Sequence, residues 1–215
     1  MATEKKIVII DYGLGNIYSI NQACQHFGYN PIVSSKEEDI LSADSLILPG
    51  VGAFKVAIDQ LNDKGLVDPI LEFVKTGKPM MGVCLGMQLL FDESEEFGLH
   101  KGLGLIPGSI RKFPSEVNGQ KLRVPNIGWN KNFEEKTGVS WDETPLKETK
   151  EDDFLYFIHS FYADPKLPES VLSTSDYQGF KYCSSVKHEN VYGFQFHPEK
   201  SGEIGLSIFK NFLKL

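Results

Sequence analysis

The chain has 215 residues, which is enough to bury a sizeable core, and we expect one α/β domain over residues 1–215. Its net charge of −7 argues against nucleic acid or an anionic membrane as a partner, and no apolar run approaches the roughly 20 residues of a membrane span. Three widely separated cysteines, none in a CxxC pair, argue against disulfides or a metal site and favour the cytoplasm.

The first half of the chain alternates strand and helix patterns. Three apolar runs are typical of strands buried on both faces: KIVIID (6–11), DSLILPG (44–50) and KPMMGVC (78–84). A helical pattern follows each run: at roughly 17–28, over 52–77 with a break near Gly65, and over 86–98. This alternation predicts parallel βαβ units.

The second half is richer in short strands, and its turns indicate mostly antiparallel pairing. The candidate strands are GLGLIPGSIRKF (102–113), KLRVPNIGWNKNF (121–133), FLYFIHSFYA (154–163), VLSTSDY (171–177), GFKYCSSVKHE (179–189) and NVYGFQF (190–196). The polar segment 134–153 is expected at the surface, and an amphipathic helix at roughly 202–214 ends the chain. We therefore predict an α/β fold with a mostly parallel central sheet, flanking helices and an antiparallel portion in the second half.

Cys84 lies between two glycines, in GVCLG (82–86), where a predicted strand gives way to a helix. The same strand–turn–helix pattern forms the nucleophile elbow of α/β hydrolases. A cysteine on such a turn lies at the carboxyl edge of the sheet, where the N-terminus of the next helix favours the thiolate. The alternative is a buried, inert cysteine at the end of a core strand.

A thiolate nucleophile needs a base, and His197 is the first candidate among five histidines. In extended backbone Glu199 would project to the same side as His197, and could hydrogen-bond one imidazole nitrogen and leave the other for a thiol. Alternatively, His197 ends the strand and Glu199 is a first-turn acid of the last helix. His159 is the rival base but has no carboxylate two residues away. The other three are expected at the surface: His26, His100 and His188.

GVCLGMQLL and, about 110 residues later, GFQFHPEKS resemble the class I (triad) glutamine amidotransferases. The resemblance extends to the glutaminase subunit of imidazole glycerol phosphate synthase, in that family's order and over nearly the whole chain. The matching segments are IIDYGLGNI (9–17), LILPGVGAF (46–54), GVCLGMQLLFDESEE (82–96), PNIGWN (125–130), YFIHSFYA (156–163) and GFQFHPEKSG (193–202). This resemblance implies a flavodoxin-like amidotransferase fold without a cofactor or metal.

The resemblance also implies a role for each matching residue. Cys84 would attack the side-chain amide of L-glutamine, while His197 would take the thiol proton and later protonate the leaving ammonia. Glu199 would orient His197, and water would hydrolyse the γ-glutamyl thioester to glutamate. Backbone N–H groups of Val51 and Leu85 would hold the oxyanion. The rest of the glutamine pocket would comprise Gly50, Gly52, Gln88, Glu96, Ser160 and Phe161.

In this family the ammonia passes to a (β/α)8-barrel cyclase subunit, which implies a heterodimer in histidine biosynthesis. Asn16, Trp129 and Lys200 match positions at that subunit interface. The alternative for Trp129 is that it packs in the core. One residue departs from the pattern, because Asn126 stands near the expected partner face where the family usually has histidine. Paralogues also exist, so an alternative ammonia acceptor is a different partner, such as a surface-polysaccharide sugar amidotransferase.

Two readings from other functional classes also apply to the sequence. A cysteine peptidase or γ-glutamyl hydrolase on the same fold is one, but Gln88 and the PGVG segment (49–52) argue against it. A non-catalytic interaction subunit is the other, and it would be expected to lack Cys84, His197 or Glu199. All three residues are present.

Overall fold

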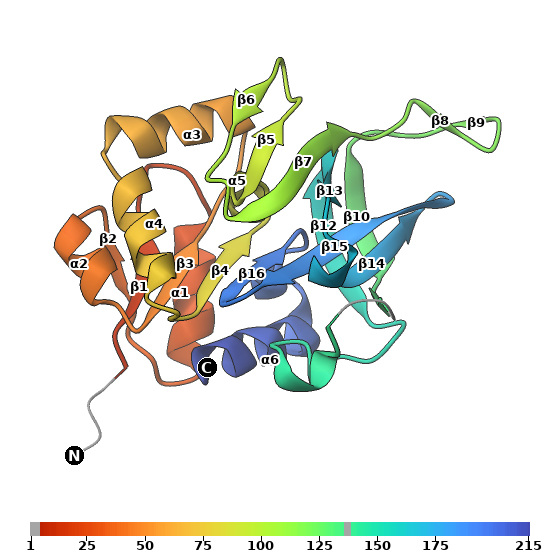
Figure 1. Cartoon of the computed structure of the whole chain (residues 1–215). Coiled ribbons are helices and arrows are strands. Elements are labelled where there is room, and N and C mark those ends of the chain that lie inside the picture. The colour runs from red at the N-terminus through yellow and green to blue at the C-terminus, as the bar shows by residue number, and fades with distance from the viewer. Residues whose placement is uncertain (1–4, 136–138) are drawn as a thin grey trace.

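The computed structural model describes residues 5–135 and 139–215, and a large mixed sheet forms its centre (Figure 1). Within these residues the sheet has 12 strands, and its main path runs β2-β1-β3-β4-β16-β15-β13-β7-β5-β6. The path begins with strands that pair in parallel: β2 (Ile32–Ser34), β1 (Ile7–Ile10), β3 (Ser45–Leu48), β4 (Met80–Val83) and β16 (Val191–Phe194).

The strands beyond β16 pair mostly antiparallel, although β5 and β7 are parallel. Apart from β5 and β6, they come largely from the second half of the chain. They are β5 (Phe91–Ser94), β6 (His100–Lys101), β7 (Ile106–Lys112), β11 (Phe133–Glu134), β13 (Phe161–Pro165), β14 (Val171–Tyr177) and β15 (Phe180–His188). Two ribbons form separate sheets: β8 (Glu116–Val117) with β9 (Gln120–Lys121), and β10 (Asn126–Lys131) with β12 (Phe154–His159). The predicted fold class is confirmed.

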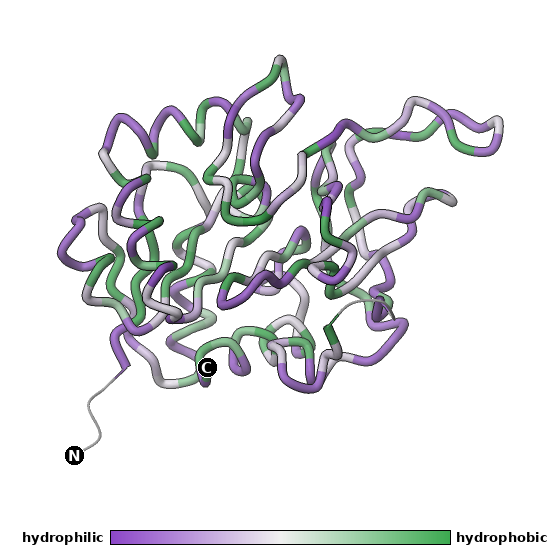
Figure 2. Tube along the Cα trace, in the orientation of Figure 1, coloured by the Kyte–Doolittle hydropathy of each residue, from purple (hydrophilic) through white to green (hydrophobic). Residues whose placement is uncertain are grey.

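Helices cover both faces of the parallel strands. The helices are α1 (Ile17–His26), α2 (Glu37–Ser42), α3 (Phe54–Asp63), α4 (Val67–Lys75), α5 (Leu85–Leu89) and α6 (Gly202–Leu213), with 3-10 turns at Trp141–Glu143, Pro168–Ser170 and Pro198–Lys200. Successive strand residues face opposite sides, so Val8 packs in the cluster with α3 and α4 while Ile9 packs with α1 and α6. Figure 2 shows the resulting concentration of hydrophobic segments along the central strands. Among the described residues, no helix combines the length and apolar character needed to cross a membrane.

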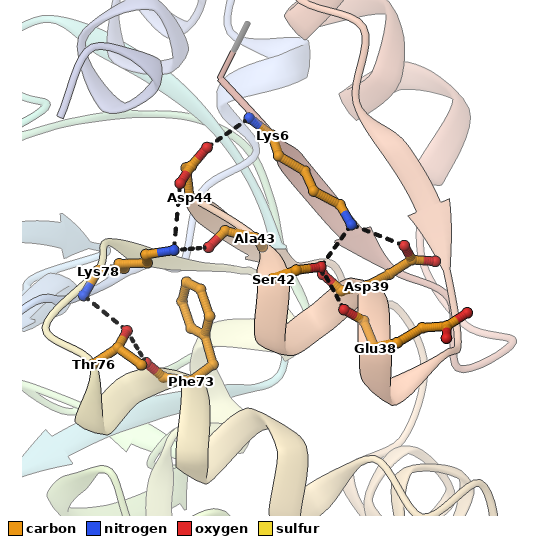
Figure 3. Close-up of polar contacts among 9 residues, drawn as sticks. All are labelled: Lys6, Glu38, Asp39, Ser42, Ala43, Asp44, Phe73, Thr76 and Lys78. Atoms are coloured by element: carbon orange, nitrogen blue, oxygen red, sulfur yellow. Dashed lines mark hydrogen bonds and ion pairs between the residues drawn. The ribbon is translucent and has the colours of Figure 1, made fainter. Parts of the chain in front are cut away.

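The amino ends of the parallel strands are joined by charged side chains (Figure 3). The backbone N–H of Lys6 donates to the Asp44 carboxylate at 2.9 Å, and the Lys6 ammonium donates to Asp39 at 3.0 Å. Lys78, before β4, lies 3.3 Å from the other Asp44 oxygen and also donates to the Ala43 carbonyl. These contacts tie the starts of β1, β3 and β4 together at the edge of the sheet that faces away from Cys84.

Two predicted segments differ from the structure. The helix expected over 86–98 ends at Leu89, because residues 91–94 form β5 and pair with β6 and β7. Tertiary strand pairing there overrides the local helical pattern. The polar segment 134–153, of which 136–138 lie outside the described residues, is not purely surface. Trp141 and Leu146 within it are buried, and the Trp141 indole N–H donates to the Leu172 carbonyl at 2.8 Å.

Candidate active site

Cys84 connects β4 to α5 and lies on a sharply turned backbone. Its φ of 55° and ψ of −113° fall in a region that non-glycine residues rarely adopt, and such strain typically costs about 1–3 kcal/mol. The turn is held by close backbone packing, since a Cβ at Gly86 would collide with the Leu48 carbonyl and one at Gly50 with the Gly86 nitrogen. The strained geometry carries the thiol to the carboxyl edge of the sheet, as an elbow requires.

His197 and Glu199 follow β16, which lies beside β4 in the sheet. The imidazole Nδ1 of His197 lies 2.8 Å from Glu199 Oε1, so the predicted contact is present. Its local cause differs from the prediction, because a 3-10 turn at Pro198–Lys200 brings the carboxylate back rather than an extended segment. The His197 backbone is anchored by its N–H to the Tyr156 carbonyl at 2.9 Å and by its carbonyl, which accepts from Ser201 Oγ at 2.7 Å.

The environment of His197 favours its protonated form. Burial alone would lower the pKa of the imidazole, but the neighbouring Cys84 sulfur and Glu199 carboxylate outweigh burial and raise that pKa to about 10. The second nitrogen, Nε2, is buried and has no hydrogen-bond partner of ordinary geometry among the described residues. A nitrogen in this position can receive a proton from the thiol.

Cys84 and His197 open into a cavity of about 360 Å³, a size suited to a small molecule. The lining is Val51, Gly52, Cys84, Leu85, Gln88, Glu96, Pro125, Ile158, His159, Ser160, Phe161, His197 and Lys200. The structure thus brings together all the residues predicted for the pocket except Gly50, which packs beneath the elbow. Leu85 is the first residue of α5, so its N–H has no acceptor within the helix, while Gly52 adopts a φ of 102° beside Val51.

Two of the predicted polar residues of the pocket, Gln88 and Glu96, are held by contacts with other parts of the chain. Gln88 Nε2 donates to the Phe161 carbonyl at 3.2 Å and to Gln195 Oε1 at 2.9 Å. Glu96 Oε2 accepts from the Phe54 N–H at 2.6 Å, at the N-terminus of α3, where a negative charge is favoured. Glu96 therefore has a structural contact while its carboxylate also lines the cavity.

The residues predicted at a partner interface lie around the cavity mouth or on the surface next to it. Asn16 Nδ2 donates to Glu199 Oε1 at 3.3 Å, and the exposed Lys200 lines the cavity. Trp129 is 53% exposed on β10, which excludes the alternative that it packs in the core. Asn126 is different: it is fully buried and donates to His159 Nε2 and to the Tyr182 hydroxyl, both at 3.1 Å. Asn126 thus belongs to the ribbon that carries the exposed Trp129, but its own side chain points inward and is not exposed.

His159, the rival base, lines the same cavity but is occupied on both ring nitrogens. Nδ1 lies 2.8 Å from the Phe161 carbonyl, so it carries the hydrogen, and Nε2 accepts from Asn126. Burial lowers the pKa of His159 to about 4. His159 is thus a neutral hydrogen-bonded residue of the cavity wall, and His197 is the histidine placed to act on Cys84.

Gln195 is a site residue that the sequence reasoning missed. It is fully buried, and its Nε2 lies 3.8 Å from the Cys84 sulfur. A usable indication was its position two residues before His197 at the end of a strand, because residues i and i+2 project to the same side.

Comparisons with known proteins assign the class. Residues 8–215 match the family described as Glutamine amidotransferase class-I, and the chain belongs to this family. Imidazole glycerol phosphate synthase subunit HisH 1 of Legionella pneumophila (strain Lens) is 45% identical over 210 residues, which cover 97% of this chain and 99% of that protein. The HisH subunit of Syntrophotalea carbinolica is 44% identical over 208 residues, covering 96% of this chain and 98% of that protein. Within the class, the chain is a member of this HisH group.

Solved structures show the same fold at lower identity. PurLQS from Thermotoga maritima aligns with a TM-score of 0.72 and 20% identity, covering 99% of each chain. A glutamine amidotransferase from the same organism aligns with a TM-score of 0.60 and 16% identity, covering 98% of this chain and 84% of that one. The class I amidotransferase fold predicted from the sequence is confirmed.

Proposed function

We propose that this chain is the glutaminase subunit of an imidazole glycerol phosphate synthase, with Cys84, His197 and Glu199 as its catalytic residues. One observation carries the proposal: Cys84, on its strained turn, and His197, which is paired with the buried Glu199, open into a single cavity of small-molecule size. Full-length identity of 45% to a HisH subunit supports L-glutamine as the amide substrate. Any other small amide would have to fit the same lining.

The geometry supports a thioester mechanism. The Cys84 proton passes to His197 Nε2, and the sulfur forms a bond to the glutamine side-chain carbonyl carbon. The N–H groups near Val51 and Leu85 stabilise the oxyanion that results. The carbon–nitrogen bond then breaks, and the ammonia leaves with the proton that His197 held. Water, deprotonated by His197, attacks the thioester, so glutamate is released and the thiol is restored.

The partner proposed for this subunit is a (β/α)8-barrel cyclase that receives the ammonia. An exposed apolar face on the β10–β12 ribbon supports docking next to the cavity, since Ile127 and Ile158 pair across it and Trp129 lies one position along that face. Asn16 contacts Glu199 directly, so a partner that engages Asn16 or Lys200 would touch the neighbourhood of the proposed triad. We further propose a cytoplasmic heterodimer in which residues 1–215 act as one domain.

A different ammonia acceptor is the alternative that Asn126 raised. Because Asn126 is buried inside the β10–β12 ribbon, its difference from the usual histidine does not alter the exposed face directly. Nothing among the described contacts favours a sugar amidotransferase partner over the cyclase, so the histidine pathway stays the first proposal.

The test is glutamine hydrolysis by the purified chain with and without the barrel protein that co-purifies with it. Cys84→Ala should lower hydrolysis at least about a thousandfold while thermal unfolding and partner binding stay as in the parent. Hydrolysis at the parental rate would refute Cys84 as the nucleophile. Glutamine-dependent formation of imidazole glycerol phosphate by the complex would support the cyclase partner, and its absence despite active hydrolysis would point to another acceptor.

A further inference from the structure

Gln195 occupies a buried position between the proposed nucleophile and the glutamine pocket. It follows β16, and its backbone N–H donates to the Ser184 carbonyl on β15 at 2.9 Å, which fixes where the side chain starts. Its Oε1 accepts from Gln88 Nε2 at 2.9 Å, and its Nε2 lies 3.8 Å from the Cys84 sulfur, within hydrogen-bonding range for sulfur. The side chain therefore bridges Gln88 and Cys84.

The orientation of both amides follows from their neighbours. The Phe161 carbonyl can only accept, so the Gln88 atom that faces it must be the NH2 group. The same Gln88 nitrogen faces Gln195, which must therefore present its oxygen there. Consequently the other end of the Gln195 amide, facing Cys84, is the NH2 group. A hydrogen bond from His159 Nδ1 to the same Phe161 carbonyl fixes this acceptor from a second side.

We propose that Gln195 is a further catalytic residue, whose amide N–H donates to the Cys84 sulfur and stabilises the thiolate. The inference rests on the proposed glutaminase function. Apart from His197, the described residues give the thiol one other polar contact, because its S–H can donate to the Ile158 carbonyl at 3.9 Å. That carbonyl can only accept, so it loses its bond when the proton moves to His197 Nε2. The hydrogen bond from Gln195 becomes stronger when the thiol ionises, because a donor bonds more strongly to a charged acceptor than to a neutral one.

The groups around the sulfur explain why a neutral donor is useful there. His197 accepts the thiol proton, and the Glu199 carboxylate balances the positive charge that results. Tyr12 and His159 stay neutral. Burial, with a smaller contribution from the Cys84 charge, raises the pKa of the Tyr12 phenol, and burial lowers the pKa of His159 to about 4. Glu96 and Lys200 line the cavity with opposite charges. Gln195 adds a fixed dipole toward the sulfur without adding another group that titrates.

The experiment measures how fast iodoacetamide alkylates Cys84 in the full-length chain as a function of pH. This reagent reports on the thiolate and does not need the amino-acid end of the glutamine pocket. Gln195→Met, which removes the donor, should move the alkylation profile up by about one pH unit, equivalent to about tenfold slower alkylation on its rising part. Gln120→Met, at an exposed glutamine on β9, should leave the profile where it is.

Gln195→Glu provides a second variant in case Gln195→Met fails to fold. It keeps an oxygen toward Gln88 but presents an oxygen instead of an N–H group to the sulfur. Alkylation should again shift to higher pH, and by at least as much as in Gln195→Met. An unshifted profile in a folded variant would overturn the proposal, as would a change confined to the KM for glutamine, which would mean that Gln195 acts only through Gln88.

The glutaminase proposal has its own readout. If the parent chain hydrolyses glutamine and Cys84→Ala does not, the proposed function stands whatever the Gln195 variants do. Conversely, Gln195 could shift the alkylation profile of a chain that fails to hydrolyse glutamine. The two hypotheses can therefore fail separately.

Discussion

The two edges of the parallel sheet use polar groups in opposite ways. At the amino edge, Lys6, Asp44 and Lys78 are partly exposed and pair with one another or with nearby backbone (Figure 3). At the carboxyl edge, the side chains of His197 and Glu199 are 2% and 0% exposed, and Cys84 is buried on a strained backbone. Two of their polar atoms, His197 Nε2 and Glu199 Oε2, have no hydrogen-bond partner among the described residues.

The contrast lies in the buried ionisable groups, because unpartnered hydroxyls such as Ser45 Oγ also occur away from the cavity among the described residues. A buried ionisable pair and a strained backbone both cost free energy, and such features cluster at functional sites. The same parallel strands meet a cluster of solvated ion pairs at one end and the cavity at the other. Ligands of open α/β sheets bind at the carboxyl ends of the strands, which agrees with the position of the cavity. The contrast predicts large effects on activity at one edge and small effects on stability at the other.

The sharpest way to test the carboxyl edge is Glu199→Gln. The substitution keeps the shape but removes the charge that helps to hold the pKa of His197 near 10, so that pKa should fall. Hydrolysis should drop about a thousandfold or more, since a mispaired imidazole loses both its orientation and its stabilised charged form. Steady-state kinetics with the barrel partner present would measure the loss.

The matched control is Glu148→Gln, at a solvated ion pair with Lys210. Its hydrolysis rate should equal that of the parent. If Glu199→Gln also kept the parental rate, Glu199 would have no part in catalysis. A buried acid at the carboxyl edge would then matter no more for activity than a solvated one.

A second prediction concerns His159 and the pH dependence of stability. Burial lowers the pKa of His159 to about 4 from the ordinary 6.5, so between these values the unfolded chain binds a proton that the folded chain does not. The free energy of unfolding should therefore fall as pH drops through this window, by up to about 1.4 kcal/mol per pH unit from this group. The pKa of His197 is raised to about 10, so its effect on the free energy of unfolding falls at pH values above 6.5, outside this window.

Urea denaturation at several pH values would measure this slope. His159→Asn retains an amide near the Nδ1 position but cannot titrate, so its slope should be shallower than that of the parent, whatever its stability at neutral pH. His26→Asn, at an exposed histidine on α1, should keep the parental slope. Equal slopes in all three proteins would show that burial of His159 does not control acid stability.

The parts of the site that the sequence anticipated are those encoded by local spacing. Cys84 between two glycines at a strand–helix junction, and Glu199 two residues after His197, each occupy one short segment. Cys84 and His197 meet in one cavity because β4 and β16 are parallel neighbours. Spacing alone does not reveal which strands are neighbours. That Cys84 and His197 act together was predicted from the family resemblance of the segments that contain them.

The features that the sequence reasoning missed depend on contacts between distant segments. Gln195 reaches Gln88 across 107 positions, and the inward orientation of Asn126 depends on His159, which lies opposite it in the β10–β12 ribbon. The helix expected through residues 91–94 likewise gave way to a strand, because β6 and β7 offer hydrogen-bonding edges there. Trp141 stands in a polar segment and is buried only because the chain folds back over it.

The smallest predicted effect lies at the amino edge, in Asp44→Asn. The hydrogen bond from the backbone N–H of Lys6 is the main cause that lowers the pKa of the Asp44 carboxyl; burial opposes it, and Lys78 adds a weaker lowering. A lowered pKa contributes stability above the unfolded value of 3.8 that is lost as pH falls below it. Because Asp44 is 47% exposed, solvent screening limits the cost of the substitution to at most about 1 kcal/mol at neutral pH.

Urea denaturation should show that the difference in the free energy of unfolding between Asp44→Asn and the parent shrinks in acid, while glutamine hydrolysis stays unchanged. Asp63→Asn, at an exposed position on α3, is the control. A loss of hydrolysis in Asp44→Asn would mean that the two edges are coupled through the strands, and that the amino edge does more than hold them in register.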